Sequence, residues 1–450
     1  MDHYPQESMS PIYRRVSFRI LPILFCCYLI NYLDRVNVSF AQLRMSSFLG
    51  IGTAAYGFGA GLFFIGYFFF QVPCNLLLNR MGARRCLSLI MLIWGVVAAC
   101  TAFIHTEWQF YLARFSLGAS EAGFFPGVIL YLTWWYPASV RARVLAVFLT
   151  AIPVSGLLGG PLSGWILQNV NGGGLQDWQW LFLLEGLPCL GMAFWVYKSL
   201  PDNPHDAPWL GEAEQQKLSA VLREEALHRA GTETADSAIA ALRLPMVWKL
   251  CLLYFCTMMG LYGLTFWLPQ MIQALGWNGA LQIGLLSAVP WSVAVVFMLI
   301  WGARSDRTQE RRLHCAFAAV IGAVGFALCG SLHNGAMGLL SISLAAAGVM
   351  GMMTVQWSLP GSLLTGSAAA AGIALVNSFG NLGGFVSPTL IGQISRVTAN
   401  PTWGQFMTAG VLFFAATLLC CSPSLEPVRI SEDKKSNLQT TRKTDFKIGL

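Results

Sequence analysis

Long apolar segments, separated by short polar ones, recur along almost the whole chain. A helix needs about 20 consecutive apolar residues to cross the hydrocarbon core of a bilayer, and the apolar segments have this length. We predict twelve spans, over residues 18–41, 54–78, 86–105, 109–135, 142–168, 178–199, 246–271, 281–302, 313–333, 336–360, 368–395 and 403–422. The pattern therefore predicts an all-α polytopic membrane protein.

One long polar segment divides these spans into two sets of six. It opens with Pro201-Asp202-Asn203-Pro204, a turn signal. Its middle, 211–229, is rich in Glu, Lys, Ala and Leu, which predicts an amphipathic helix. We expect four units: an N-terminal six-helix bundle over 1–200, a cytoplasmic linker over 201–245, a C-terminal six-helix bundle over 246–425 and a polar cytoplasmic tail over 426–450.

The basic residues indicate the orientation of the chain rather than a nucleic-acid partner, although the net charge is +7. With the N-terminus placed in the cytoplasm, only Arg44 and Arg396 fall outside, and only Arg35 and Arg114 fall deep within spans. This is the positive-inside distribution, and it predicts that both termini are cytoplasmic. The first apolar segment is too long for a cleaved signal peptide and lacks a small-residue cleavage site, so we expect an uncleaved span.

Four ionisable residues lie inside the predicted spans: Asp34 and Arg35 in the first, and Arg114 and Glu121 in the fourth. A charge at bilayer depth costs on the order of 3 kcal/mol, so such residues usually face a partner or a wet cavity. Arg114 and Glu121 are seven apart and share a helix face with Gly118 between them. The neighbours Asp34 and Arg35 diverge by about 100°, so one can face a cavity while the other turns toward another helix.

Two interpretations of these charges stay open. They could form a buried network that joins two helices, although desolvation makes such networks weak stabilisers. Alternatively, Arg35 offers a planar fork to a substrate carboxylate, Glu121 is the main proton site, Asp34 a second one, and Arg114 their partner. Protonation of a carboxylate would then release an arginine for the anion. Glu185 in the sixth span, beside Trp178 and Trp180, is interpreted as structural, with a third proton site as the alternative.

The two halves carry matching cytoplasmic loops. Residues 79–85 follow the second span, and residues 302–312 follow the eighth. Both resemble the Gly-x-x-x-Asp-Arg-x-Gly-Arg-Arg signature of the major facilitator superfamily. The N-terminal copy has Asn75 and Asn79 in place of the Gly and Asp, and the C-terminal copy carries an insertion. The resemblance implies the major facilitator fold and a conformational role for Arg80, Gly82, Arg84, Gly302, Asp306 and Arg307.

Further segments resemble the anion:cation symporter family of this superfamily, in its bacterial phthalate, 4-hydroxyphenylacetate, tartrate and aldonate permease branch. They are Tyr32–Asn37, Gln71–Leu78, Arg114 with Glu121–Gly127, Trp178–Gly186 and Ser305–Arg312. In aldonate symporters the positions matching the four charges serve proton and carboxylate binding. The resemblance also implies that Tyr32, Tyr67, Trp357 and Asn377 contact the substrate.

Polar residues at the same depth complete the predicted pocket. Gln356 precedes Trp357, and Asn381 lies one helical turn after Asn377, so the two amides can share a face. The alternative for each of these residues is ordinary hydrogen bonding and packing between helices.

We therefore expect a transporter in a bacterial cytoplasmic (inner) membrane that imports a small organic anion by proton symport. The candidate substrates are phthalate, hydroxyphenylacetate, tartrate and aldonates. Electroneutral exchange or uniport is the alternative, and it would make the carboxylates structural. Sequence patterns of hydrolases, metalloproteases and P-loop enzymes are not found, which argues against an enzyme. The intact charges argue against a transport-dead receptor.

No histidine lies in the interior of a predicted span, since His105, His314 and His333 are at span ends and the others lie outside, which disfavours a histidine metal site. We expect no cofactor other than the proton as coupling ion, no metal, no nucleic-acid partner, and a monomer in the lipid bilayer. Two questions stay open at this point: whether Glu121 neutralises Arg114, and whether the substrate carries one carboxylate or two. A single free arginine suits a monocarboxylate, and a second one suits a dicarboxylate.

Overall fold

The computed structural model describes residues 6–230, 243–332, 335–359 and 367–422. Two parts of the predicted organisation, residues 231–242 of the linker and the tail 426–450, lie outside these ranges. The helices are α1 (Gln6–Leu49), α2 (Thr53–Met81), α3 (Ala83–Cys100), α4 (Glu107–Glu121), α5 (Phe124–Thr133), α6 (Ala138–Leu149), α7 (Ala151–Asn169), α8 (Asp177–Ser199), α9 (Glu212–Ala230), α11 (Pro245–Ala274), α12 (Ala280–Thr308), α13 (Arg311–Ser331), α14 (Gly335–Gln356), α16 (Ser367–Asn381), α17 (Gly383–Thr398) and α18 (Thr402–Cys420).

Eleven helical segments in the described ranges are long and apolar enough to cross a membrane. They correspond to the first ten predicted spans and the twelfth. The remaining predicted span, 368–395, is divided between α16 and α17, which meet at Leu382 and are each too short to count alone. The prediction of an all-α polytopic membrane protein is confirmed.

Two spans are interrupted a few residues before a proline. In the fourth span, α4 ends at Glu121 and α5 begins at Phe124, two residues before Pro126. The fifth span breaks in the same way before Pro153. Proline has no N–H to donate to the carbonyl four residues earlier, so the helical ladder is broken there. As a result, Glu121 is the last residue of α4.

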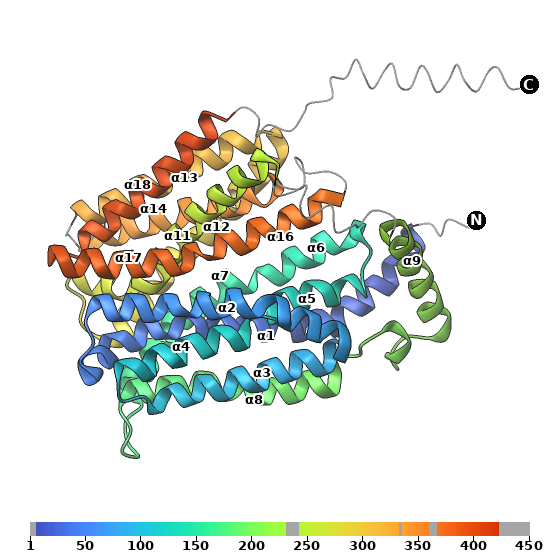
Figure 1. Cartoon of the computed structure of the whole chain (residues 1–450), viewed down its shortest axis with the longest axis horizontal. Coiled ribbons are helices and arrows are strands. Elements are labelled where there is room, and N and C mark those ends of the chain that lie inside the picture. The colour runs from blue at the N-terminus through green and yellow to red at the C-terminus, as the bar shows by residue number, and fades with distance from the viewer. Residues whose placement is uncertain (1–5, 231–242, 333–334, 360–366, 423–450) are drawn as a thin grey trace, which may run out of the picture.

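Figure 1 shows the helices in two groups that lie side by side, α1 to α8 in blue to green and α11 to α18 in yellow to red. The linker helix α9, predicted from composition, lies beside the N-terminal part of α1. Arg15 of α1 and Glu214 of α9 form an ion pair there, with 2.7 Å between nitrogen and oxygen. The residue boundaries that the sequence suggests for the bundles and the linker stay predictions.

Glycines bring helices of the two groups into backbone contact. A Cβ atom on Gly160 of α7 would lie 2.7 Å from the carbonyl oxygen of Gly284 in α12. A Cβ atom on Gly164 would lie 2.6 Å from the carbonyl oxygen of Ala280. A Cβ atom on Gly57 of α2 would overlap the carbonyl oxygen of Pro388 in α17. Small residues at such spacing permit close packing of membrane helices. These contacts all lie near the connections α1–α2, α7–α8, α11–α12 and α17–α18, at the end of the molecule away from the N-terminus.

A glycine also controls the approach of α4 to α2. A Cβ atom on Gly118 would overlap the backbone carbonyl of Phe63. The missing side chain at Gly118 therefore makes room for helix α2.

We expect Gly118→Val to destabilise the protein, because the added atoms meet backbone that cannot rotate away. Overpacking of this kind costs about 1–3 kcal/mol, and sometimes more. The measurement is thermal unfolding of the purified protein in detergent. The matched control is Gly410→Val in α18, where an added Cβ meets no atom within 4 Å. Equal melting temperatures for the two variants would contradict the prediction.

Candidate functional site

Adjacent residues of α1 point to different helices, as the predicted divergence of about 100° requires. One Nη atom of Arg35 donates to Glu121 Oε2 at 2.9 Å and lies 3.5 Å from Asn31 Oδ1, one turn earlier. Asp34 instead turns toward α3 and α8. Its Oδ2 atom accepts from Trp94 Nε1 at 2.7 Å and from the Cys189 thiol at 2.9 Å. α1 therefore directs Arg35 toward α4 and Asp34 toward α3 and α8.

Arg35 and Glu121 form a buried ion pair between α1 and α4. Their side chains are 9% and 0% exposed. The sequence-based interpretation gave Arg114 to the carboxylates as their partner and left Arg35 for the substrate. The structure corrects this pairing, because Glu121 is bound by Arg35. Arg114 and Glu121 share one helix, as predicted, but their side chains form no ion pair in the described part of the chain.

Arg114 is a buried cation without a hydrogen-bond partner. It is 1% exposed, and none of its three guanidinium nitrogens has a partner among the described residues. Its guanidinium carbon lies 5.2 Å from the ring centre of Phe63 and 6.0 Å from that of Phe266. Aromatic faces stabilise a cation by about 0.5–2 kcal/mol, less than the cost of an unpaired buried charge. Arg114 is therefore suited to an anion that enters the site.

Phe63 of α2 connects the two arginines, and sequence reasoning missed it. Its ring lies 4.8 Å from the guanidinium carbon of Arg35 and 5.2 Å from that of Arg114. The available signal was its spacing: Phe63 precedes the predicted site residue Tyr67 by one helical turn, and the two rings stack 6.1 Å apart. Phe63 therefore belongs to the same cluster as the charges.

Tyr67 and Tyr32, both predicted as site residues, lie next to Arg35. Its guanidinium carbon is 5.5 Å from the ring centre of Tyr67 and 5.8 Å from that of Tyr32. α11 adds Tyr262 and Phe266, again one turn apart, which were not predicted. Tyr262 packs against Phe64 with ring centres 4.3 Å apart. Aromatic residues from both groups of helices therefore surround the charges.

The other predicted site residues lie on α14 and α16 or between them. Gln356 is buried and its Oε1 accepts from Thr257 at 2.5 Å, while its Nε2 has no partner in the described ranges. Trp357 packs edge-on against Tyr254, with ring centres 4.9 Å apart. Asn377 and Asn381 on α16 are partly buried. No contact joins these four residues to the arginines in the part of the chain that is described, so their role stays a prediction.

Glu185 lies in a separate polar contact. Its Oε1 atom accepts from Ser163 of α7 at 2.8 Å, and Oε2 has no partner among the described residues. This bond joins α8 to α7 and agrees with the structural interpretation. The alternative of a third proton site is not tested by it.

The loop after α2, predicted to be cytoplasmic, is held by Asp202, three residues beyond the end of α8. The backbone N–H of Arg84 donates to Asp202 Oδ1 at 2.8 Å, and the Arg84 side chain donates to the carbonyl of Tyr197. Gly82 has a φ of +82° and lies against the Asp202 carboxylate. This acid stands in for the acidic residue that the loop itself lacks, and the sequence alone did not indicate it.

The C-terminal loop has a looser arrangement. Asp306 lies 3.7 Å from Arg311, and Gly302 packs against Thr354. Arg80 and Arg307, the other two predicted loop residues, are exposed. Their role in conformational change stays a prediction. The described residues contain no group of three His, Cys, Asp or Glu that could hold a metal ion, and we assign none of them to a metal or cofactor.

Residues 24–388 match the family model of the Major Facilitator Superfamily. The chain belongs to the major facilitator superfamily. Among its relatives is a protein of Agrobacterium vitis named "Putative tartrate transporter", 43% identical over 90% of each chain. Another is "Inner membrane transport protein RhmT" of Escherichia coli, 33% identical over 91% of this chain and 95% of RhmT. These relatives confirm the resemblance to the bacterial anion:cation symporter branch.

The fold is that of the superfamily. A bacterial homologue of the lysosomal transporter Spinster, solved in an inward-facing and occupied conformation, matches with a TM-score of 0.72. It covers 91% of this chain and 96% of its own, at 15% identity. This member of the superfamily is a multi-pass membrane transporter and not an enzyme.

Proposed function

We propose that this transporter imports a small organic anion together with protons, by alternating access between two six-helix bundles. The observation that carries the proposal is the buried Arg35–Glu121 ion pair beside an arginine, Arg114, that has no hydrogen-bond partner. In the described part of the chain, Arg114 is in contact with aromatic rings and is bound by no carboxylate. A substrate anion can supply this missing negative charge.

The same geometry couples proton and anion. A first carboxylate of the substrate binds Arg114, which offers a planar set of donors. A proton on Glu121 removes the charge that holds Arg35, and Arg35 then becomes available to a second anionic group. Asp34 is held by Trp94 and Cys189 on another side of α1. The two arginines therefore meet two substrate carboxylates without a competing acid only when Glu121 is protonated. A dicarboxylate therefore binds together with at least one proton.

The substrate proposed first is a hydroxy-dicarboxylate of the size of tartrate. The relative named as a tartrate transporter supports this choice. Phthalate is the aromatic dicarboxylate of the same charge, and the phenylalanine and tyrosine rings around the arginines suit its ring. Hydroxyphenylacetate and aldonates carry one carboxylate, and they would leave one arginine to a hydroxyl group or to Glu121.

We assign the present conformation to the state that opens toward the cytoplasm. With the cytoplasmic N-terminus that the charge distribution predicts, the glycine contacts between the groups lie at the outer end. Two hydrogen bonds also join the two groups of helices at this end. Thr53 donates to the carbonyl of Gly392 at 3.4 Å, and Tyr56 donates to that of Phe266 at 3.0 Å. The relative named as an inner membrane protein supports a location in the cytoplasmic membrane.

The test is uptake of labelled tartrate into proteoliposomes. An inward proton gradient of one pH unit supplies about 1.4 kcal/mol for each coupled proton, which corresponds to about tenfold accumulation. We expect accumulation of this order, its loss on addition of a protonophore, and competition by phthalate stronger than by hydroxyphenylacetate or gluconate.

The alternative, exchange or uniport, predicts a different result. Counterflow would then persist, and net uptake would be independent of the pH gradient. Transport of the monocarboxylates with tartrate excluded would instead keep the mechanism and reject the proposed substrate.

A further inference from the structure

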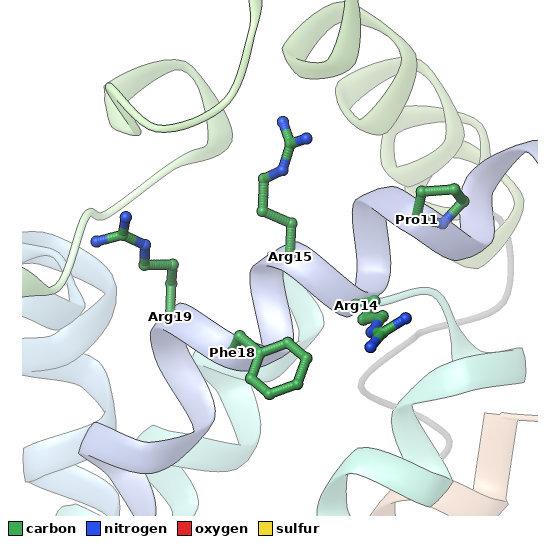
Figure 2. Close-up of a pocket in the computed structure, with 5 residues that line it drawn as sticks. All are labelled: Pro11, Arg14, Arg15, Phe18 and Arg19. Carbon is green, nitrogen blue, oxygen red and sulfur yellow. The ribbon is translucent and has the colours of Figure 1, made fainter.

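A cavity lies far from the charge cluster, between α1, α8 and the start of the linker. Its volume is about 440 Å³, and its wall combines basic and aromatic side chains, among them Phe18, Arg19, Arg84, Trp195, Lys198 and Trp209. An adjoining cavity of about 430 Å³ shares Phe18 and Arg19 with it and adds Arg14 and Arg15. Figure 2 shows that Arg15 and Arg19 extend from one side of α1 and Arg14 from the other.

Arg19 and Lys198 are cations of this cavity that form no ion pair with an acid in the described ranges. Arg19 is exposed and forms no hydrogen bond or ion pair within the described residues, and Lys198 lies 4.4 Å above the ring centre of Phe194. Arg84 is engaged with the carbonyl of Tyr197. Asp206 is the one acidic residue among the described residues of the lining, and these residues together carry an excess of positive charge.

The cavity lies at the level of lipid headgroups. Arg19 precedes Asp34 by fifteen residues on one helix, a distance of about 22 Å along its axis. Half of the hydrocarbon core measures about 15 Å, so a site charge near the midplane places Arg19 just beyond the core. Phe18 is 69% exposed and Trp195 is 41% exposed. Exposed aromatic residues at this depth mark the boundary between acyl chains and headgroups.

We propose that this cavity binds the headgroup of an anionic phospholipid of the cytoplasmic leaflet. Arg19 and Lys198 contact the phosphodiester, and Phe18 and Trp195 lie along the first part of the acyl chains. A lipid has a phosphodiester for the basic side chains and acyl chains for the aromatic ones. A free phosphate would use only the basic side chains. Basic pockets of this kind at the cytoplasmic side recognise anionic lipid headgroups. The lipid would join α1, which carries Asp34 and Arg35, to α8 and the linker.

The test counts bound lipids by native mass spectrometry of the purified full-length protein, titrated with phosphatidylglycerol or phosphatidylcholine. We expect phosphatidylglycerol to bind more tightly, and the double variant R19Q/K198Q to lose about 25-fold in affinity for it, about fivefold for each charge removed. The control R223Q/R304Q changes the net charge equally at two exposed arginines outside both cavities, and it should bind like the wild type.

Three results would overturn the proposal: equal affinity for the two lipids, unchanged phosphatidylglycerol binding in R19Q/K198Q, or an equal loss in the control. Displacement of the lipid by millimolar glycerol 3-phosphate would also reject a lipid site in favour of a free phosphate ester. If R19Q/K198Q fails to fold, R19K/K198R keeps both charges, and its affinity should stay within about twofold of the wild type.

Discussion

The substitution Glu121→Gln is expected to abolish accumulation of the anion against its gradient, while exchange of internal for external substrate continues. Glutamine keeps the shape of the side chain but carries neither a proton nor a charge. Arg35, which Glu121 binds at 2.9 Å, is then free in every state of the cycle. Substrate binding therefore no longer depends on a proton, and the pH gradient no longer drives uptake.

The measurement compares driven uptake with counterflow in proteoliposomes. For the wild type, a gradient of one pH unit should give about tenfold accumulation. For Glu121→Gln the internal concentration should only equal the external one. The matched control is Glu107→Gln, in the first turn of the same helix, where the carboxylate is exposed and bonded to Tyr111. Full accumulation by Glu121→Gln would show that Glu121 is not the coupling residue.

Arg114→Gln is expected to weaken substrate binding by about 100-fold. Truncating one partner of a buried charge pair costs about 2–5 kcal/mol, and Arg114 provides the guanidinium that no protein group occupies. Arg114→Lys keeps the charge but loses the planar fork, so its affinity should fall between those of Arg114→Gln and the wild type.

Stability separates this binding role from a structural one. In the absence of substrate, Arg114→Gln should unfold at the same temperature as the wild type or higher, because it removes an unpaired buried charge. Substrate at 100 times the wild-type Kd stabilises the wild type by about 2.7 kcal/mol, and at the same concentration this stabilisation should fall to about 0.4 kcal/mol in the variant. Arg396→Gln, an exposed arginine, should behave like the wild type in both assays. Marked destabilisation of Arg114→Gln without substrate would indicate a structural arginine.

The site shows how far spacing along a helix can predict contacts. The prediction that Asp34 and Arg35 diverge is confirmed, because it depends only on the geometry of one helix. Spacing alone left open whether Glu121 pairs with Arg114, because the answer depends on the rotation of α1 relative to α4. Phe63 was missed for a similar reason: it is one of many aromatic residues on α2, and only the packing of α2 against α4 at Gly118 places it between two arginines.

Asp202 illustrates the same limit on the cytoplasmic side. The departure of the loop from its family signature was evident, since Asn79 occupies the position of the usual acid. The replacement comes from a residue more than a hundred positions later, which reaches the loop because α3 packs against α8. A contact of this kind has no signal in the spacing of either segment.

The sequence by itself determined the class of the protein, the positions of its spans, their predicted orientation, and the presence of charged groups at membrane depth. Each of these depends on the cost of placing a segment or a charge in hydrocarbon, which is a property of the local sequence. Only the tertiary structure decided that Arg35 binds Glu121, that Arg114 has no hydrogen-bond partner among the residues it describes, and that Asp34 faces Trp94 and Cys189. These pairings follow from how helices rotate and approach one another, and that is set by packing among side chains that are distant in the sequence.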